Sequence, residues 1–247
     1  MTFHHRRRTI QTLAGAALVA ALATGASQAT VSAERAFQGS EVFADQDGVE
    51  VVGGAADSEI ETDIQSGDAI VITDPAGVSA ANDPFPEDGF GCVAIDSTSA
   101  RCDFANDGGL IAFLGAGDDV VTADRAMLGQ VFGTGGRGRD IVVLPIGSEA
   151  GLRFRGNKGA DVIAGASASD VLRGGPGPDL LRGRGGVDLV NGKKGRDQLF
   201  GGSGGDSLRA SHGDPDKRID CARGDDRAKV DRRLDPPAVG CEKVQRS

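Results

Sequence analysis

Six aspartates stand nine residues apart in the second half of the chain, and carboxylates at a fixed spacing can hold a metal ion. They are Asp161, Asp170, Asp179, Asp188, Asp197 and Asp206. If two nine-residue units make one turn of a coil, alternate aspartates fall on the same edge, where stacked strands lie about 4.8 Å apart. Like charges at this distance repel one another. A hard divalent cation with about six to eight oxygen ligands relieves that repulsion, so the spacing predicts calcium sites.

The residues around each aspartate predict the elements that position it. The unit reads G-G-x-G-x-D-x-U-x, where U is apolar, and residues 174–182 follow it closely. Glycine permits the turn conformations that aim carbonyl oxygens at a cation. The position two residues after each aspartate is apolar in every unit, namely Ile163, Leu172, Leu181, Val190, Leu199 and Leu208. Because strand side chains alternate in direction, these six point into the coil. The pattern predicts an all-β protein, a right-handed parallel β-solenoid, in which metal binding is part of folding.

Residues 156–209 resemble the RTX (haemolysin-type) calcium-binding nonapeptide repeats of secreted bacterial toxins, proteases and lipases. The resemblance implies a parallel β-roll in which aspartate side chains and carbonyls of the glycine-rich turns ligate Ca²⁺ between successive coils. It makes the six aspartates the side-chain ligands. The arrangement of the whole chain is similar to that of small exported bacterial proteins that carry such repeats between disulfide-bearing ends.

The repeats depart from the pattern at several positions. Ala166 and Ala168 replace preferred residues in the unit of Asp170, so we expect the site at Asp170 to be the weakest. Three basic residues stand in turns that would face a cation, namely Arg184, Lys193 and Lys194. We expect their side chains to point outward and to reduce the calcium affinity.

Two earlier segments carry the same signature at a wider spacing. Residues 115–121 include Asp119, residues 135–142 include Asp140, and each of these aspartates lies 21 residues before the next one of its edge. Wider coils whose opposite half-turn has lost the motif would explain the spacing. Asp119 and Asp140 are therefore further candidate ligands, and an ordinary glycine-rich turn is the alternative. We expect the roll to cover residues 111–210, with strict repeats at 156–209.

The N-terminus has the pattern of a secretory signal peptide at residues 1–29. A basic head ends at Arg8, an apolar run covers residues 13–23, and small residues precede a cleavage point after Ala29, with cleavage after Ala33 as the alternative. Both general and twin-arginine export remain open. The apolar run is too short for a comfortable membrane span, so we expect a secreted, extracellular protein without stable membrane insertion.

All four cysteines follow the signal peptide: Cys92, Cys102, Cys221 and Cys241. An even number of cysteines outside the cytoplasm indicates disulfides. Three connectivities are open, and we favour the pairing of nearest neighbours. Residues 30–110 contain short β-type runs, which predict a small β cap on the first coil. Residues 211–247 are expected to form a C-terminal capping segment that is locked by a disulfide.

The amino-acid composition limits the classes of function that we expect for this chain. The formal charge is −9, and we expect the excess negative charge to lie in the aspartate turns, which favours cations over nucleic acid. The chain has no Trp, no Tyr and no H-E-x-x-H motif, and we predict no catalytic residue. The predicted function is a secreted calcium-binding module with a structural or interaction role, whose partner is a protein or polysaccharide at or outside the cell surface. The alternative is a small polysaccharide lyase or epimerase on the same coil.

Overall fold

The structure, a computed structural model, describes residues 40–45, 48–52, 59–65, 69–73, 78–80, 91–94, 99–103, 109–123 and 130–247. The predicted signal peptide lies outside these residues. Every helix or strand that the structure describes is a β-strand, which confirms the all-β class. In the described residues, no helix has the length and hydropathy that a membrane span requires.

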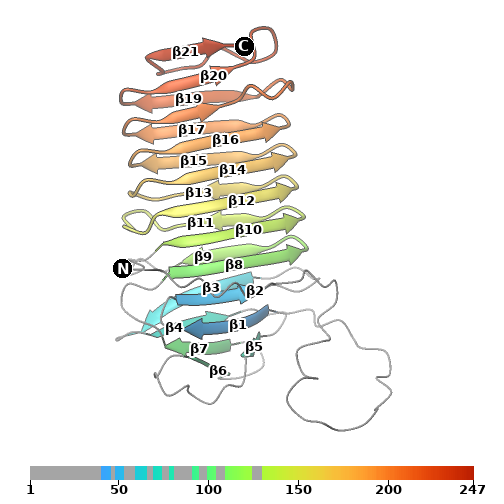
Figure 1. Cartoon of the computed structure of the whole chain (residues 1–247), viewed down its shortest axis with the longest axis vertical. Helices are drawn as coiled ribbons and strands as arrows, with labels where there is room; N and C mark the ends of the chain where they lie inside the picture. Colours follow the sequence, from blue (N-terminus) through green and yellow to red (C-terminus); the bar gives the residue numbers. More distant parts are fainter. Residues whose placement is uncertain are drawn as a thin grey trace, which may run out of the picture. The chain divides into compact units, whose positions relative to one another are not determined.

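The strands form two sheets, and from β8 to β20 the chain alternates between them (Figure 1). The first sheet has 11 strands, in the order β21 (Lys243–Arg246), β20 (Arg227–Val230), β18 (Ser207–Arg209), β16 (Leu189–Lys194), β14 (Val171–Pro176), β12 (Leu152–Lys158), β10 (Val131–Arg137), β8 (Gly109–Ala116), β2 (Gly48–Val52), β1 (Ser40–Asp45) and β5 (Val78–Ala80). The second has 10, in the order β19 (Arg218–Arg223), β17 (Gln198–Ser203), β15 (Leu180–Gly185), β13 (Val162–Ala164), β11 (Ile141–Val143), β9 (Val120–Ala123), β3 (Glu59–Gln65), β4 (Ala69–Thr73), β7 (Ser99–Asp103) and β6 (Gly91–Ala94).

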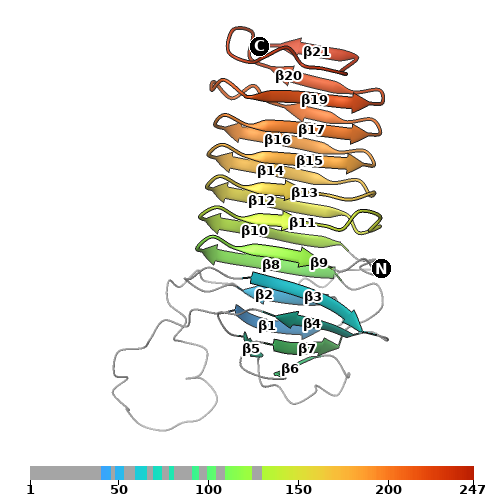
Figure 2. The same cartoon turned by 180° about the vertical axis from the view of Figure 1, so that it is seen from behind.

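Parallel pairing of these strands confirms the predicted β-solenoid. In the strict repeats, residues 18 apart lie side by side, as Ile163 does with Leu181 and Leu181 with Leu199. Parallel pairing begins with β2 and β3 and continues to β21, so it extends beyond residues 111–210 at both ends (Figure 2). It continues at the C-terminal end because Ile219 and Ala228 keep the apolar position of the repeat and are buried.

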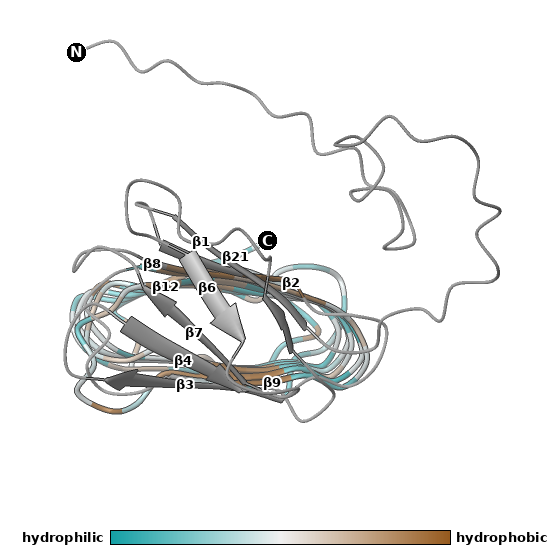
Figure 3. Ribbon diagram, turned by 90° about the horizontal axis from the view of Figure 1, so that it is seen from below, coloured by the Kyte–Doolittle hydropathy of each residue, from teal (hydrophilic) through white to brown (hydrophobic). Residues whose placement is uncertain are grey.

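The core lies between the two sheets. All six apolar residues predicted to point inward are buried, each at most 1% exposed. Seen along the coil, the strands place hydrophobic residues on facing sheets, and the turns at both edges are mostly hydrophilic (Figure 3). Among the described residues, Phe154 on β12 is the largest fully buried side chain, and leucines such as Leu110 and Leu152 continue the core into the earlier coils. The sheets therefore hold the turns, and with them the aspartates, in two edges.

The N-terminal strands change from parallel to antiparallel pairing. β1 pairs antiparallel with β2, and β3 with β4, so each of the first two parallel strands is covered by a hairpin partner. β4 and β6 both pair antiparallel with β7, and the register places Cys92 opposite Cys102. The predicted small β cap is confirmed, while the Cys92–Cys102 disulfide itself remains a prediction.

A disulfide closes the C-terminal end, as predicted. Cys221 on β19 is bonded to Cys241, which lies two residues before β21, with Cα atoms 5.2 Å apart. The intervening chain returns along β19, where the Cys221 N–H donates to the Val239 carbonyl at 2.8 Å and the Val239 N–H donates to the Ile219 carbonyl at 3.0 Å. The last strand of the second sheet is thereby covered.

Candidate metal-binding edges

The solenoid gathers the aspartates into two rows, one at each edge. The long row contains Asp119, Asp140, Asp161, Asp179, Asp197, Asp216 and, at its C-terminal end, Asp235. The short row contains Asp170, Asp188, Asp206 and Asp226. All eight candidates from the sequence therefore lie in a row. Each is at most 2% exposed, which is an unusual degree of burial for a carboxylate.

One oxygen of each carboxylate has a structural partner. From Asp140 onward, the Oδ1 atom accepts a hydrogen bond from the backbone N–H of the residue in register one coil earlier, which is an aspartate except for Asp170, whose partner is Leu152. Asp179 Oδ1 accepts from Asp161 at 2.9 Å, Asp197 Oδ1 accepts from Asp179 at 2.9 Å, and the short row repeats the bond between Asp206 Oδ1 and Asp188 at 2.9 Å. These bonds tie the coils together along each edge.

The second carboxylate oxygen has no such partner. Among the described residues, the Oδ2 atoms of eight aspartates are buried and accept no hydrogen bond: Asp140, Asp161, Asp179, Asp188, Asp197, Asp206, Asp216 and Asp226. A buried charge without a partner is costly, and buried charges are normally paired or bound to metals. A cation bound beside these Oδ2 atoms would therefore offset the cost of burying the carboxylates.

The first glycine of each unit leaves room beside these oxygens. A Cβ atom added to Gly174 would overlap Asp179 Oδ2 and would lie 2.7 Å from the carbonyl oxygen of Gly192 in the next coil. The short row repeats this arrangement, since a Cβ added to Gly183 would overlap Asp188 Oδ2 and lie 2.7 Å from the Gly201 carbonyl. Carboxylate and carbonyl oxygens thus converge on a small space. These are the ligands that Ca²⁺ prefers, so the residues fit this ion.

A complete coordination shell for Ca²⁺ would need backbone carbonyl oxygens in addition to the carboxylates. In the part of the chain that the structure describes, no group of three or more His, Cys, Asp or Glu side chains could hold a metal ion. A site would combine a carboxylate with turn carbonyls, as the glycine positions suggest.

Burial raises the pKa of these carboxyl groups. The pKa of Asp179 rises to about 8, mainly because burial disfavours the charged form, while the hydrogen bond from Asp161 lowers it and the charges of Asp161 and Asp197 raise it. The pKa of Asp216 rises to about 8 and those of Asp140 and Asp188 to about 7, again mainly through burial. Without a cation, protons compete for these oxygens near neutral pH.

Comparison with protein-family models decides what these turns are. Residues 153–181, 164–199 and 182–214 match the RTX calcium-binding nonapeptide repeat, in 4 copies. The chain carries RTX calcium-binding repeats. The resemblance inferred from the sequence is thereby confirmed for residues 153–214, which include the six aspartates at nine-residue spacing. The chain matches no curated protein and no solved structure.

The RTX turn of Asp170 differs from the others. Asp170 Oδ2 accepts a hydrogen bond from the Ala166 N–H at 3.1 Å, so it is partnered within its own turn. Arg184, from the next coil, donates from Nη1 to the carbonyl oxygens of Gly165 at 2.9 Å and Leu144 at 2.6 Å. Lys193 and Lys194 are exposed, as expected, but the expectation that Arg184 points outward is wrong, because its guanidinium finds acceptors on the two preceding coils.

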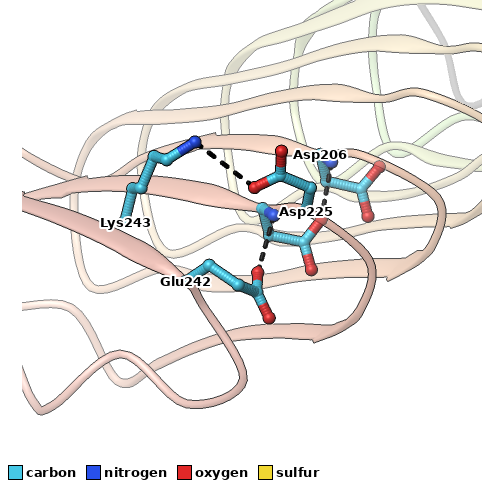
Figure 4. Close-up of polar contacts among 5 residues, drawn as sticks. Asp206, Asp225, Glu242 and Lys243 are labelled. Atoms are coloured by element: carbon cyan, nitrogen blue, oxygen red, sulfur yellow. Dashed lines mark hydrogen bonds and ion pairs between the residues drawn. The ribbon is translucent and has the colours of Figure 1, made fainter.

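Three row members lie outside the RTX spacing and were missed: Asp216, Asp226 and Asp235, the last of which follows Asp216 by 19 residues. Asp216 follows Asp197 by 19 residues, and Asp226 follows Asp206 by 20, because the turns before them are longer. The G-x-D pattern of residues 224–226 and the apolar Ala228 were the available signal for Asp226. At the end of the short row, the Asp226 N–H donates to Glu242 Oε2 at 2.7 Å, so Glu242 takes the place of a further aspartate (Figure 4).

The expectation that the excess negative charge lies in the aspartate turns is wrong. Residues 131–247 contain 21 Lys and Arg and 16 Asp and Glu, a formal charge of +5, so the chain's excess negative charge lies before residue 131 and not in the RTX turns. Basic and acidic residues alternate in the sequence, but the roll separates them. The row aspartates other than Asp235 are buried, whereas arginines such as Arg153, Arg155 and Arg209 are exposed.

Proposed function

We propose that this is an exported protein whose RTX repeats coil by binding Ca²⁺, and that the resulting roll is a structural or interaction module at or outside the cell surface. The eight buried aspartate oxygens without a hydrogen-bond donor carry the proposal. The signal-peptide pattern at residues 1–29 and the Cys221–Cys241 disulfide support export to an oxidising compartment.

Residues of the chain would place the ligand oxygens of each calcium site before the ion binds. Sheet pairing brings the carboxylates of one row together, the first glycine of each unit keeps the space beside Oδ2 open, and the carbonyl of the next coil faces it. Bound Ca²⁺ would supply the positive charge that offsets repulsion within a row. The cap at residues 30–110 and the segment 211–247 would protect the ends of the roll from edge-to-edge pairing.

A calcium titration followed by far-ultraviolet circular dichroism tests the proposal. The purified protein should gain β-structure cooperatively as calcium rises to the millimolar range, because each coil that binds calcium supports its neighbour. Asp188→Asn should shift the midpoint to higher calcium. Asp225→Asn is the matched control, because Asp225 is exposed and outside both rows. A spectrum that does not respond to calcium would contradict the proposal.

A second observation favours an acidic polysaccharide as the partner of this module. Strands β12, β14, β16, β18, β20 and β21 contain 11 Lys and Arg and no Asp or Glu. Arg155, Arg173, Asn191, Arg209 and Lys229 follow one another in register across this sheet. Within the described residues, Lys243 is the one of these 11 that forms an ion pair, with Asp225 at 3.4 Å.

This column has a cation on four of five successive strands, which lie about 4.8 Å apart, and Asn191 interrupts it on the third. Such an array suits a linear polymer with many carboxylates. Polygalacturonate should bind the calcium-loaded protein in a salt-dependent manner, and neutral dextran should not. The triple change Arg155→Ser, Arg173→Ser and Arg209→Ser should abolish binding. The same change at three exposed arginines outside these strands, Arg139, Arg182 and Arg223, is the control for net charge. Equal binding by both variants would exclude the column as the docking surface.

We propose no catalytic activity. Residues 201–205 match the G-x-S-x-G pattern of serine hydrolases, but Ser203 is exposed in a repeat turn, and its Oγ donates to the Arg184 carbonyl at 3.4 Å and not to a base. The lyase or epimerase alternative is tested by incubating polygalacturonate or alginate with the calcium-loaded protein. New unsaturated ends or changed uronate composition would establish an enzyme.

A further inference from the structure

The short row stops where the long row continues. In the register of Asp170, the preceding coils carry Leu152, then Val131, then Leu110. The turn at residues 144–151, which would have to supply a carboxylate for another site, contains Glu149 as its only acidic residue, and Glu149 is exposed. The layer between this turn and the turn of Asp170 therefore has carbonyl oxygens but no buried carboxylate from its first coil.

Arg184 fills this layer. Its Nη1 lies 2.9 Å from the Gly165 carbonyl oxygen and 2.6 Å from the Leu144 carbonyl oxygen, which occupy the first position of two successive turns. In other turns the same carbonyl, such as that of Gly192, faces an unpaired aspartate oxygen. The guanidinium is therefore bound to the type of oxygen that we assign to calcium elsewhere.

The backbone of Arg184 is adapted to this role. Arg184 stands at the second position of its unit, where Gly202 of the next coil on the same sheet has φ +125° and an added Cβ would overlap the Arg184 carbonyl oxygen. Arg184 adopts φ 79° instead, a left-handed conformation that costs free energy for a residue with a side chain. Lys193, at the second position of another unit, shares this conformation with φ 74°, but its side chain is exposed.

We propose that Arg184 takes the place of a calcium ion at the N-terminal end of the short row and joins three coils without metal. This inference rests on the proposed calcium function of the rows. A guanidinium is permanently charged and has several planar donors, so it can satisfy carbonyl oxygens where carboxylates are lacking. Calcium would be a poor occupant of that layer, because its shell there would consist mainly of neutral oxygens. Residues 141–188 thus form a metal-independent segment from which calcium-driven coiling spreads toward the C-terminus.

Amide hydrogen exchange in excess chelator tests the assignment. In the wild-type protein, strands β11, β13 and β15 should exchange at least about tenfold more slowly than β16, β17 and β18, because the charge-assisted hydrogen bonds of Arg184 hold the former. Arg184→Gly, which restores the motif residue and suits the positive φ, should abolish this difference in chelator. Lys193→Gly is the matched control and should preserve it.

Saturating calcium provides the second arm of the experiment. All three proteins should be fully protected there, because the calcium sites of the rows do not use the Arg184 side chain. If Arg184→Gly fails to fold even in calcium, Arg184→Gln, which removes the charge and keeps most of the stem, replaces it with the same expectation. A chelated Arg184→Gly protein that keeps the slow strands of the wild type would overturn the inference. Exchange that is identical with and without calcium in the wild type would instead overturn the calcium function.

Discussion

At the scale of single residues, each row aspartate has two separate tasks. Its Oδ1 atom accepts a backbone N–H from the preceding coil, and its Oδ2 atom faces the carbonyl of the next, as for Asp179. The first task needs only an acceptor, whereas the second needs negative charge. Asparagine therefore separates the two tasks, because it keeps the acceptor and loses the charge.

Asp179→Asn should weaken calcium binding more than Asp170→Asn. Asp179 has a free Oδ2 and charged neighbours on both sides of its row, whereas Asp170 Oδ2 already accepts the Ala166 N–H and Arg184 contributes positive charge nearby. We expect the calcium midpoint of Asp179→Asn to rise about tenfold or more, from the loss of roughly 1.5–3 kcal/mol. Circular dichroism titrations give both midpoints, and equal values would refute the ranking.

The pKa shifts predict opposite pH dependences with and without calcium. Burial raises the pKa of Asp188 to about 7 and that of Asp179 to about 8 in the folded chain, against about 3.9 for an unfolded aspartate. The folded state then binds more protons than the unfolded state between about pH 4 and pH 8, so the metal-free roll loses stability as pH rises through this window. Calcium competes with protons for the same oxygens, so the loaded protein should gain stability over this window. Thermal unfolding at pH 5 and pH 8 should show the reversal, and parallel trends would contradict it.

At the scale of elements, the glycine-rich turn decides whether a site can exist. The first glycine of a unit has an ordinary backbone conformation and is required because the carboxylate lies against its Cα, as Asp179 does against Gly174. The sheets determine only the register of the turns. The space for a cation is therefore a property of the turn sequence.

Gly174→Ala should impair calcium binding, whereas Gly205→Ala should not. The added methyl at Gly174 would overlap Asp179 Oδ2, but at Gly205 the nearest atom is the Asp225 carbonyl oxygen at 3.6 Å, an ordinary contact. Neither glycine has a positive φ that alanine would have to adopt. The calcium midpoint should rise severalfold for Gly174→Ala and stay at the wild-type value for Gly205→Ala in the same titration.

Strict periodicity explains which elements the sequence could predict. Period and polarity together specify the buried column of Ile163, Leu181 and Leu199 and both aspartate edges, because a coil of constant length leaves each residue type in one register. Where the coil length changes, counting in steps of the repeat no longer locates the row aspartate. This is why Asp216, which follows a longer turn, was not predicted. The contact of Arg184 with Leu144 joins residues 40 positions apart and depends on a side-chain rotamer, which no spacing rule encodes.

At the scale of the whole molecule, the roll sorts charges that alternate along the chain. Carboxylates are buried in the two rows, and the strands of the first sheet from β12 to β21 present lysines and arginines without acidic residues, as in β12 and β20. Cation binding inside and anion binding outside are compatible because a two-residue side-chain period separates the two surfaces. The loss of calcium should therefore also abolish binding of an acidic polymer, since the basic column exists only when the strands are in register.

The central claim is that the repeats beyond the Arg184-joined segment cannot close into a roll until calcium bridges the buried aspartates. Small-angle X-ray scattering of the purified protein, measured in excess chelator and again in millimolar calcium at pH 7.5, tests it most directly. We predict that the radius of gyration falls markedly when calcium is added, because the repeats that Arg184 does not join pass from an extended to a coiled state. Equal radii in the two buffers, together with equal resistance to protease, would contradict the account.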